Sequence, residues 1–119
     1  MATVLVVDDE FGIVDVLETI LTDESYRVLT ACNGEQGLVR LSEEKPDVIL
    51  SDFMMPILGG GEMLRAMAAD PDYQRIPVIM MSSLGEDVIA ERCKGYAAFL
   101  HKPFRASAVL STVARVVGS

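Results

Sequence analysis

The sequence has 119 residues, the length of one domain, since domains usually contain about 100–150 residues. Half of the residues are hydrophobic, enough for one buried core, and the formal net charge of −8 argues against direct binding to nucleic acid. No apolar run approaches the ~18 residues of a membrane span, and Asp8, Asp9 and Glu10 end the first apolar run too early for a signal peptide. We therefore expect one domain over residues 1–119 that contacts neither membrane nor nucleic acid.

The two cysteines, Cys32 and Cys93, are far apart and have no spacing typical of a metal site. Reduced thiols in the cytoplasm explain them most simply, because the sequence provides no disulfide framework. We therefore expect a cytoplasmic protein.

The first half of the chain alternates between strand and helix patterns. Residues 3–7 form a continuous apolar run, typical of a strand that is covered on both faces. Apolar residues then recur at helical spacing over 13–21, and residues 26–31 have the pattern of a second strand. A short helix is predicted over 35–44, and a third apolar strand over 48–51.

The second half repeats this alternation after a glycine-rich loop. An inward-facing helical stripe covers 63–67, and residues 77–81 have the pattern of a fourth strand. A helix predicted over 86–93 precedes a short fifth strand over 97–100, and the last helical stripe lies within 110–117.

Alternating strands and helices indicate an α/β domain, in which a doubly wound, five-stranded parallel sheet carries helices on both faces. Crossovers between parallel strands are right-handed in about 98% of cases. The pattern does not fix the order of the strands in the sheet.

Four of the five predicted strands end in a charged or hydroxyl side chain. Asp8 and Asp9 follow the first strand. Asp52 follows the third, Ser82 the fourth and Lys102 the fifth. Because ligands of open parallel sheets bind outside the carboxyl ends of the strands, we expect these side chains to share one site.

Each of these residues alone also has an ordinary structural explanation. Asp9 or Glu10 would suit the N-cap of the first helix, and Asp52 would suit a turn. Lys102 would suit a solvated surface, and the isolated His101 is predicted to face outward in a structural role. The common position at strand ends favours a shared site over four independent explanations.

Carboxylates that converge at one edge repel one another unless one is protonated or a cation lies between them. Ligands that are all oxygen select a hard ion such as Mg²⁺, with Mn²⁺ as a substitute. Lys102 would pair with a phosphoryl oxygen and the Ser82 hydroxyl would donate to another. Asp52 lies on a central strand beside these ligands, so it is the predicted nucleophile.

Four segments of the chain together resemble the receiver domain of two-component response regulators, in its single-domain, chemotaxis-regulator-like form. They are V-L-V-V-D-D-E at 4–10, V-I-L-S-D-F-M-M-P at 48–56, I-P-V-I-M-M-S-S at 76–83 and H-K-P-F at 101–104. The resemblance covers essentially the whole chain, and the joint order of the segments is specific. It implies the flavodoxin-like strand order 2-1-3-4-5 and often a cis peptide bond before the proline that is here Pro103.

The resemblance also assigns a metal site. Asp9 and Asp52 would ligate Mg²⁺ through their side chains, and Asp8 would hold the metal's waters. Met54 would contribute its backbone carbonyl oxygen.

The same resemblance assigns the phosphorylation chemistry. Asp52 would accept a phosphoryl group from a phosphohistidine of a sensor histidine kinase or phosphotransfer protein. Ser82 would hydrogen-bond the phosphoryl group, Lys102 would pair with it, and Phe99 would be the aromatic side chain that rotates with Ser82 in the switch. The protein would then be a signalling module and not an enzyme with a separate substrate.

The sequence departs from the usual family pattern at several positions. Serine stands at position 82, where threonine is commoner, and glycines at 59–61 replace a pattern that normally ends in Asp-Gly. A flexible start for the following helix explains these glycines most simply. Met54 and Leu84, at the two positions that tune loss of phosphate in the family, are both apolar.

Little sequence follows the last predicted helix, so we expect output through a downstream protein partner. The family implies a face formed by the fourth helix, the fifth strand and the fifth helix, which here includes Arg92, Ala97, Ala98, Arg105 and Ala106. The alanine pair replaces the acidic pair that one subgroup uses for symmetric dimers. We therefore expect a monomer or a weak dimer.

Two other classes of protein are alternatives to a receiver domain for this sequence. A phosphohydrolase of the haloacid dehalogenase type also uses an aspartyl nucleophile, but places it in an Asp-x-Asp motif, whereas Asp8 and Asp9 are adjacent. A flavin-binding module of similar topology would need a phosphate-binding loop after the first strand, where the acidic residues here would repel a phosphate.

Overall fold

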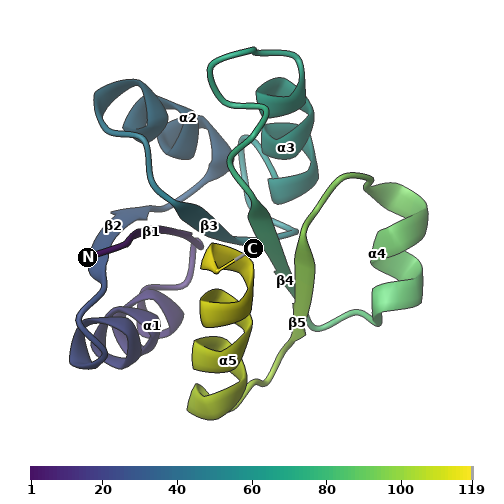
Figure 1. Ribbon diagram of the computed structural model, residues 1–119. Helices are drawn as coiled ribbons and strands as arrows, with labels where there is room; N and C mark the ends of the chain where they lie inside the picture. Colours follow the sequence, from purple (N-terminus) through teal and green to yellow (C-terminus); the bar gives the residue numbers. More distant parts are fainter. Residues whose placement is uncertain (119) are drawn as a thin grey trace.

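The computed structural model describes residues 1–118, in which five parallel strands form one sheet between two layers of helices (Figure 1). The elements in chain order are β1 (Thr3–Val7), α1 (Phe11–Asp23), β2 (Arg27–Ala31), α2 (Gly34–Glu43), β3 (Val48–Asp52), α3 (Gly60–Ala68), β4 (Val78–Ser82), α4 (Glu86–Arg92), β5 (Ala98–His101) and α5 (Ala106–Val117). No helix in this described part is long and apolar enough to span a membrane.

The strand order is β2-β1-β3-β4-β5, which confirms the order implied by the resemblance. The chain leaves β1 toward β2 on one side and later places β3 on the other side of β1. In the register between these strands Val7 pairs with Ser51, so the next residues, Asp8 and Asp52, lie side by side at the ends of the two strands. This change of direction is the switch point where doubly wound sheets bind ligands.

The three central strands are fully buried because each sheet face carries its own hydrophobic core. In β1, Val4 and Val6 face α1 and α5, whereas Leu5 and Val7 face the layer of α2, α3 and α4. Each fully buried aliphatic side chain of this size stabilises the fold by about 1.5–3 kcal/mol. Burial on both faces explains why these strands lack the alternating polar pattern of a half-exposed strand.

The strands lie within one residue of their predicted positions, but three helices are longer than their apolar stripes. Helix α1 extends over Phe11–Asp23 and α5 begins at Ala106. Hydrogen bonds at the helix ends set these limits, and the apolar stripe covers only the inward face. In α2, the Asn33 side chain accepts a hydrogen bond from the Gln36 N–H at 2.8 Å and fixes the start of the helix.

The glycine-rich segment forms the start of α3, as its simplest explanation predicted. The Glu62 carboxylate accepts a hydrogen bond from the Gly59 N–H at 3.2 Å, and the Gly60 N–H donates to the Phe53 carbonyl at 2.9 Å. A Cβ atom on Gly60 would collide with the Asp52 carbonyl oxygen. Glycine is therefore required at position 60, because α3 starts in contact with the end of β3.

The substitution Gly60→Ala is expected to lower the free energy of unfolding by about 1–3 kcal/mol, because the added methyl group overpacks the contact with β3. The matched control is Gly12→Ala, since a Cβ at Gly12 in α1 meets no atom within 4 Å. That control should raise stability by about 0.5–1 kcal/mol, the helix-propensity difference between glycine and alanine. Urea unfolding measures both, and shifts of the same sign would contradict the packing argument.

Candidate functional site

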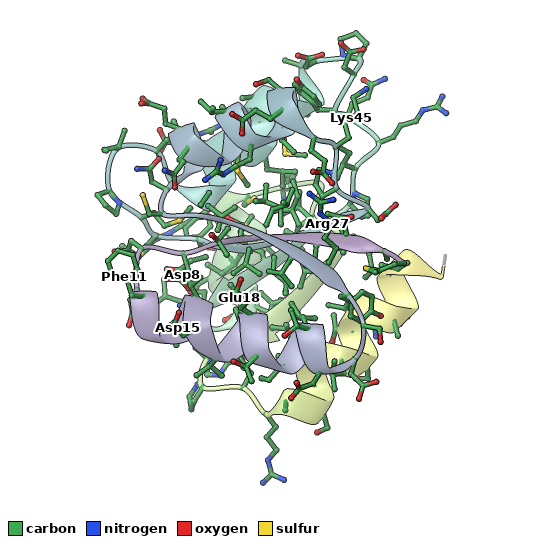
Figure 2. The ribbon with its side chains drawn as sticks, turned by 90° about the vertical axis from the view of Figure 1, so that its left-hand side faces the viewer. Asp8, Phe11, Asp15, Glu18, Arg27 and Lys45 are labelled. Atoms are coloured by element: carbon green, nitrogen blue, oxygen red, sulfur yellow. The ribbon has the colours of Figure 1, made fainter. Side chains whose placement is uncertain are left out.

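An acidic cluster lies at the carboxyl ends of β1 and β3. Asp8, Glu10 and Asp52 each bring a carboxylate oxygen within 4.8 Å of the others, and they form the one potential metal-binding group found among residues 1–118. Asp8 is 1% exposed and Asp52 8% exposed. Figure 2 shows Asp8 beside the start of α1, near the exposed Phe11. Two nearly buried carboxylates at this edge need a positive charge between them.

Lys102 provides that charge in the described structure. Its Nζ lies 2.8 Å from Asp8 Oδ2, 3.3 Å from Asp52 Oδ1 and 3.9 Å from Glu10 Oε1. Its side chain is only 13% exposed, so these interactions are poorly screened by water. The Lys102 backbone N–H also donates to the Ser82 carbonyl at 2.8 Å, which ties the lysine to β4.

Backbone donors complete the shell of the two aspartates. The Glu10 N–H donates to Asp8 Oδ1 at 3.0 Å, and the Phe53 N–H donates to Asp52 Oδ1 at 3.1 Å. Hydrogen bonds to an ionised carboxylate stabilise the charged form. The cluster is therefore held in place by the turns that leave β1 and β3.

The pKa of the Asp52 carboxyl group lies closer to neutral pH than the ordinary value of an aspartate. Burial, and then the neighbouring Asp8 carboxylate, raises the pKa of Asp52 to about 6, although Lys102 and the Phe53 N–H act in the opposite direction. Burial by itself lowers the pKa of Lys102, but its hydrogen bond to Asp8 and the charges of Asp52 and Asp8 outweigh burial and raise that pKa. The ionised form of Asp52 would therefore be stabilised by an additional cation.

Ser82 ends β4 and is 4% exposed. Its Oγ accepts a hydrogen bond from the Leu84 N–H at 3.0 Å, so its hydroxyl proton is available for another acceptor. In the sheet register Asp52 pairs with Met81, one residue before Ser82. The predicted residues Asp8, Asp52, Ser82 and Lys102 therefore all lie at the same edge of the sheet.

Asp9 and Met54 have more open positions. Asp9 is exposed and does not belong to the group of close carboxylates, whereas Glu10 does. Met54 follows β3 with its residue surface 63% exposed. Sequence reasoning considered Glu10 only as an N-cap. It occupies the N-cap position of α1, but its side chain makes no capping hydrogen bond, which frees the carboxylate for the cluster.

Phe99 lies on β5, half-buried against the core that faces α3 and α4. Its ring centroid lies 6.4 Å from that of His101, which is exposed as predicted. The peptide bond between Lys102 and Pro103 is cis, as the resemblance led us to expect.

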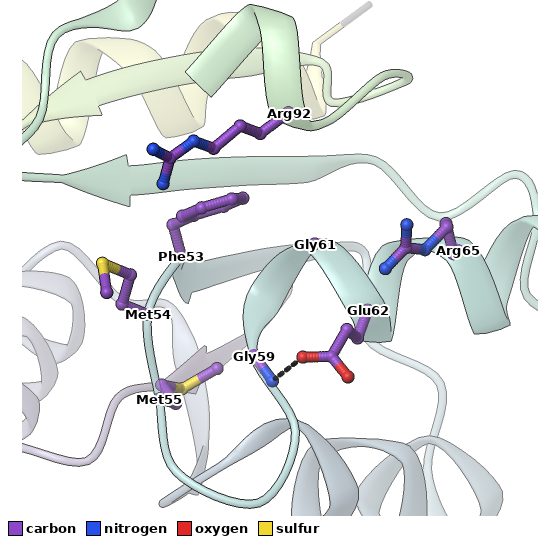
Figure 3. Close-up of a pocket in the computed structure, with 8 residues that line it drawn as sticks. All are labelled: Phe53, Met54, Met55, Gly59, Gly61, Glu62, Arg65 and Arg92. Atoms are coloured by element: carbon purple, nitrogen blue, oxygen red, sulfur yellow. Dashed lines mark hydrogen bonds between the residues drawn. The ribbon is translucent and has the colours of Figure 1, made fainter. Parts of the chain in front are cut away.

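One residue expected on the face formed by α4, β5 and α5 is buried. Ala98 is 8% exposed and packs into the core with Leu100, because alternate residues of β5 point into this core, so its side chain does not contribute to that face. Arg92 ends α4 and is exposed, and its side chain extends over Phe53 (Figure 3).

The donors at the cluster fit a hard divalent cation. They are carboxylate oxygens with no sulfur or imidazole among them, and their separation of at most 4.8 Å allows a shared ion. Part of the negative charge is exposed through Glu10, which gives an ion and its waters access. The residues present therefore fit Mg²⁺ or Mn²⁺, and the chemistry of the donors does not distinguish the two.

A doubly wound fold with an acidic site and a lysine at its switch point defines a class of α/β proteins, and the comparisons identify the family. The family model of the response regulator receiver domain matches residues 4–114. The chain therefore belongs to the receiver domain family of response regulators, and the expected resemblance is confirmed.

Curated relatives include both long and short proteins. The chain is 38% identical over 105 residues to the probable transcriptional regulator ycf27 of Porphyra purpurea, with 85% of this chain and 41% of that protein covered. It is 33% identical over 119 residues to protein PilH of Pseudomonas aeruginosa, with 98% of each covered. The chain thus spans less than half the length of the regulators of the ycf27 type and nearly all of PilH.

Solved structures confirm the flavodoxin-like receiver fold. The chemotaxis response regulator CheY4 of Vibrio cholerae superimposes with a TM-score of 0.90 at 33% identity, with 98% of each chain covered. The receiver domain of sensor histidine kinase PA1611 from Pseudomonas aeruginosa has a TM-score of 0.90 at 27% identity, with 99% of this chain and 98% of that one covered. That structure carries a magnesium ion in its active-site cleft.

The substitution Asp52→Asn is expected to stabilise the metal-free protein at pH 7 and to have no such effect near pH 4. The folded-state pKa of about 6 exceeds the ordinary value of 3.8, so stability from this group is present below pH 4 and lost as the pH rises through 6. Removing the charge should recover about 1–2 kcal/mol at pH 7. Urea unfolding at both pH values measures the difference. The exposed control Asp72→Asn should change little at either pH, and a loss of stability in Asp52→Asn at pH 7 would contradict the electrostatic argument.

Proposed function

We propose that this receiver domain is a phosphorylation-dependent switch that accepts a phosphoryl group on Asp52. The donor is a phosphohistidine of a sensor histidine kinase or of a phosphotransfer protein. The observation that carries the proposal is the position of Asp52 at the switch point, 3.3 Å from the Lys102 ammonium and beside Asp8. Membership of the receiver family supports the same reaction.

The two oxygens of Asp52 have different surroundings, which suggests their roles. The Phe53 N–H donates a hydrogen bond to Oδ1, and the Lys102 ammonium forms its ion pair with the same oxygen. Oδ2 is therefore the oxygen that we assign as nucleophile. It forms the new bond to phosphorus while the P–N bond to the donor imidazole breaks and its electron pair returns to the ring. Lys102 stabilises the negative charge on the phosphoryl oxygens.

The metal of this reaction is proposed to be Mg²⁺, or Mn²⁺ in its place. Asp9 and Asp52 would bind it directly, Asp8 would hold its waters, and the Met54 carbonyl would be a further ligand. Glu10, which lies in the carboxylate group where Asp9 does not, is a second candidate for the acidic ligand after β1. When bound, the metal supplies positive charge that neutralises the carboxylates and the transferred group.

The switch is proposed to depend on Ser82 and Lys102. Shifting a two-state population from 1:99 to 99:1 takes about 5.5 kcal/mol, and a hydrogen bond to a charged group contributes roughly 1.5–3 kcal/mol. New contacts from the Ser82 hydroxyl and from Lys102 to a phosphoryl group together reach this range. The half-buried Phe99 would then change its packing, since it lies on β5 opposite Met80, two residues before Ser82 on β4.

Output is proposed to pass to a downstream protein through the face of α4, β5 and α5, with Ala97, Arg105 and Ala106 exposed on it. We propose that the chain acts in the cytoplasm, as a monomer or weak dimer, and that Asp52 phosphorylation and its hydrolysis are its only chemistry. Membrane and nucleic acid are not direct partners in this proposal, in keeping with the net charge of −8.

Incubation with acetyl phosphate and Mg²⁺ should add one phosphoryl group to the wild-type protein, as measured by intact-protein mass spectrometry. Asp52→Ala should add none, because it lacks the nucleophile. Asp47→Ala provides a control that removes another carboxylate near a strand start, and it should still be phosphorylated. Phosphorylation of Asp52→Ala, or steady turnover of phosphate esters by the wild type, would overturn the proposal.

Self-dephosphorylation should be slow, because Met54 and Leu84 are apolar and offer no side chain to orient the attacking water. The phosphorylated protein should persist for many minutes after removal of the donor, as followed by mass spectrometry. Met54→Asn should shorten this lifetime by providing a polar group. A wild-type lifetime of only seconds would refute the prediction.

A further inference from the structure

A groove separate from the acidic cluster lies between α3, α4 and the loop that follows β3 (Figure 3). Its volume is about 530 Å³, within the range of small-ligand and peptide pockets. Phe53, Met54 and Met55 line it from the loop, Glu62 and Arg65 from α3, and Arg92 from α4. The proposed phosphorylation chemistry uses neither of these arginines.

The groove is basic in an acidic protein. Arg65 and Arg92 are exposed, and across residues 1–118 neither forms an ion pair with a carboxylate. Figure 3 shows Arg92 reaching over Phe53 from α4 and the Arg65 guanidinium directed from α3 toward the groove. Since the chain as a whole carries a formal net charge of −8, two arginines that form no ion pair mark this groove as more attractive to anions than the rest of the surface.

The one acidic side chain in the groove has another role. Glu62 accepts the hydrogen bond from the Gly59 N–H at 3.2 Å, which fixes the start of α3. It still offsets one of the two arginine charges, so the lining carries one net positive charge. That balance suits a single carboxylate better than a di- or triphosphate.

The remaining lining is apolar and adaptable. Phe53 and Met55 are half-buried and Met54 is exposed, so the floor presents an aromatic ring and two thioether side chains. Methionine adapts its shape to different apolar groups and is enriched where proteins bind varied peptides. An apolar side chain that covers this floor removes apolar surface from water, which favours binding.

We propose that this groove binds an acidic peptide segment of a partner protein. An Asp or Glu carboxylate of the peptide is attracted into the groove by Arg65 and Arg92, which lie toward its two ends (Figure 3), and a neighbouring apolar side chain covers Phe53 and the two methionines. The groove is lined mainly by α3 and the loop after β3, with Arg92 as its one residue from α4 and none from β5 or α5, so it is centred away from the face of α4, β5 and α5. Binding here does not require phosphoryl transfer to Asp52, so the two proposals can fail separately.

The test is an NMR titration of the ¹⁵N-labelled, unphosphorylated protein with the capped tripeptide acetyl-Leu-Asp-Phe-amide. Saturable shifts are expected at the Phe53, Met55 and Gly61 amides and at the Arg65 and Arg92 side chains. The matched peptide with Asn in place of Asp should bind about five-fold more weakly, the size expected for one partly exposed charge-assisted contact.

Variants locate the contact. Arg65→Gln and Arg92→Gln should each weaken the acidic peptide about five-fold. The exposed control Arg75→Gln, which lies outside the groove, should bind it like the wild type. Three outcomes would overturn the proposal: equal binding of the Asn peptide, shifts confined to other surfaces, or tighter binding of ATP than of the acidic peptide at the same residues.

Discussion

The ion pairs of Lys102 hold the functional edge of this protein together. One ammonium group lies within hydrogen-bonding distance of Asp8 and close to Asp52, on two strands that would otherwise end in mutually repelling carboxylates. The Lys102 backbone N–H also donates to the Ser82 carbonyl at the end of β4. Lys102 therefore links the ends of β1, β3 and β4. Low exposure of all these groups keeps the interactions strong, because water screens them little.

The sheet makes this arrangement possible. Both of its faces are covered by helices, so side chains within the central strands must be apolar, and a charge can emerge only where a strand ends. The reversal of strand order around β1 leaves the ends of β1 and β3 uncovered by a crossover. Glycine is required at position 60 at the same edge, since α3 starts in contact with the Asp52 carbonyl.

The acidic cluster and the basic groove are neighbours with opposite charge. Phe53 connects them: its N–H binds the Asp52 carboxylate, its carbonyl accepts from Gly60, and its ring lines the groove. The carboxylates on one side of this loop suit a cation, and an anionic partner is proposed for the arginines on the other. The membership of the chain in the receiver family accounts for the first site, and the second rests on the charges and apolar surface of this sequence.

Periodicity predicted the order and type of all ten elements, and the strand ends predicted that Asp8, Asp52, Ser82 and Lys102 would meet, because carboxyl ends of parallel strands share one edge. Strand order came only from the resemblance, since apolar patterns do not record which strands are neighbours. The sequence could not show that Glu10 joins the cluster while Asp9 faces solvent, or that Ala98 is buried and Arg92 extends over Phe53. Local patterns determine which face of an element is apolar. The direction of a side chain at an element's end depends on the elements that pack beside it, and only the tertiary structure decides that.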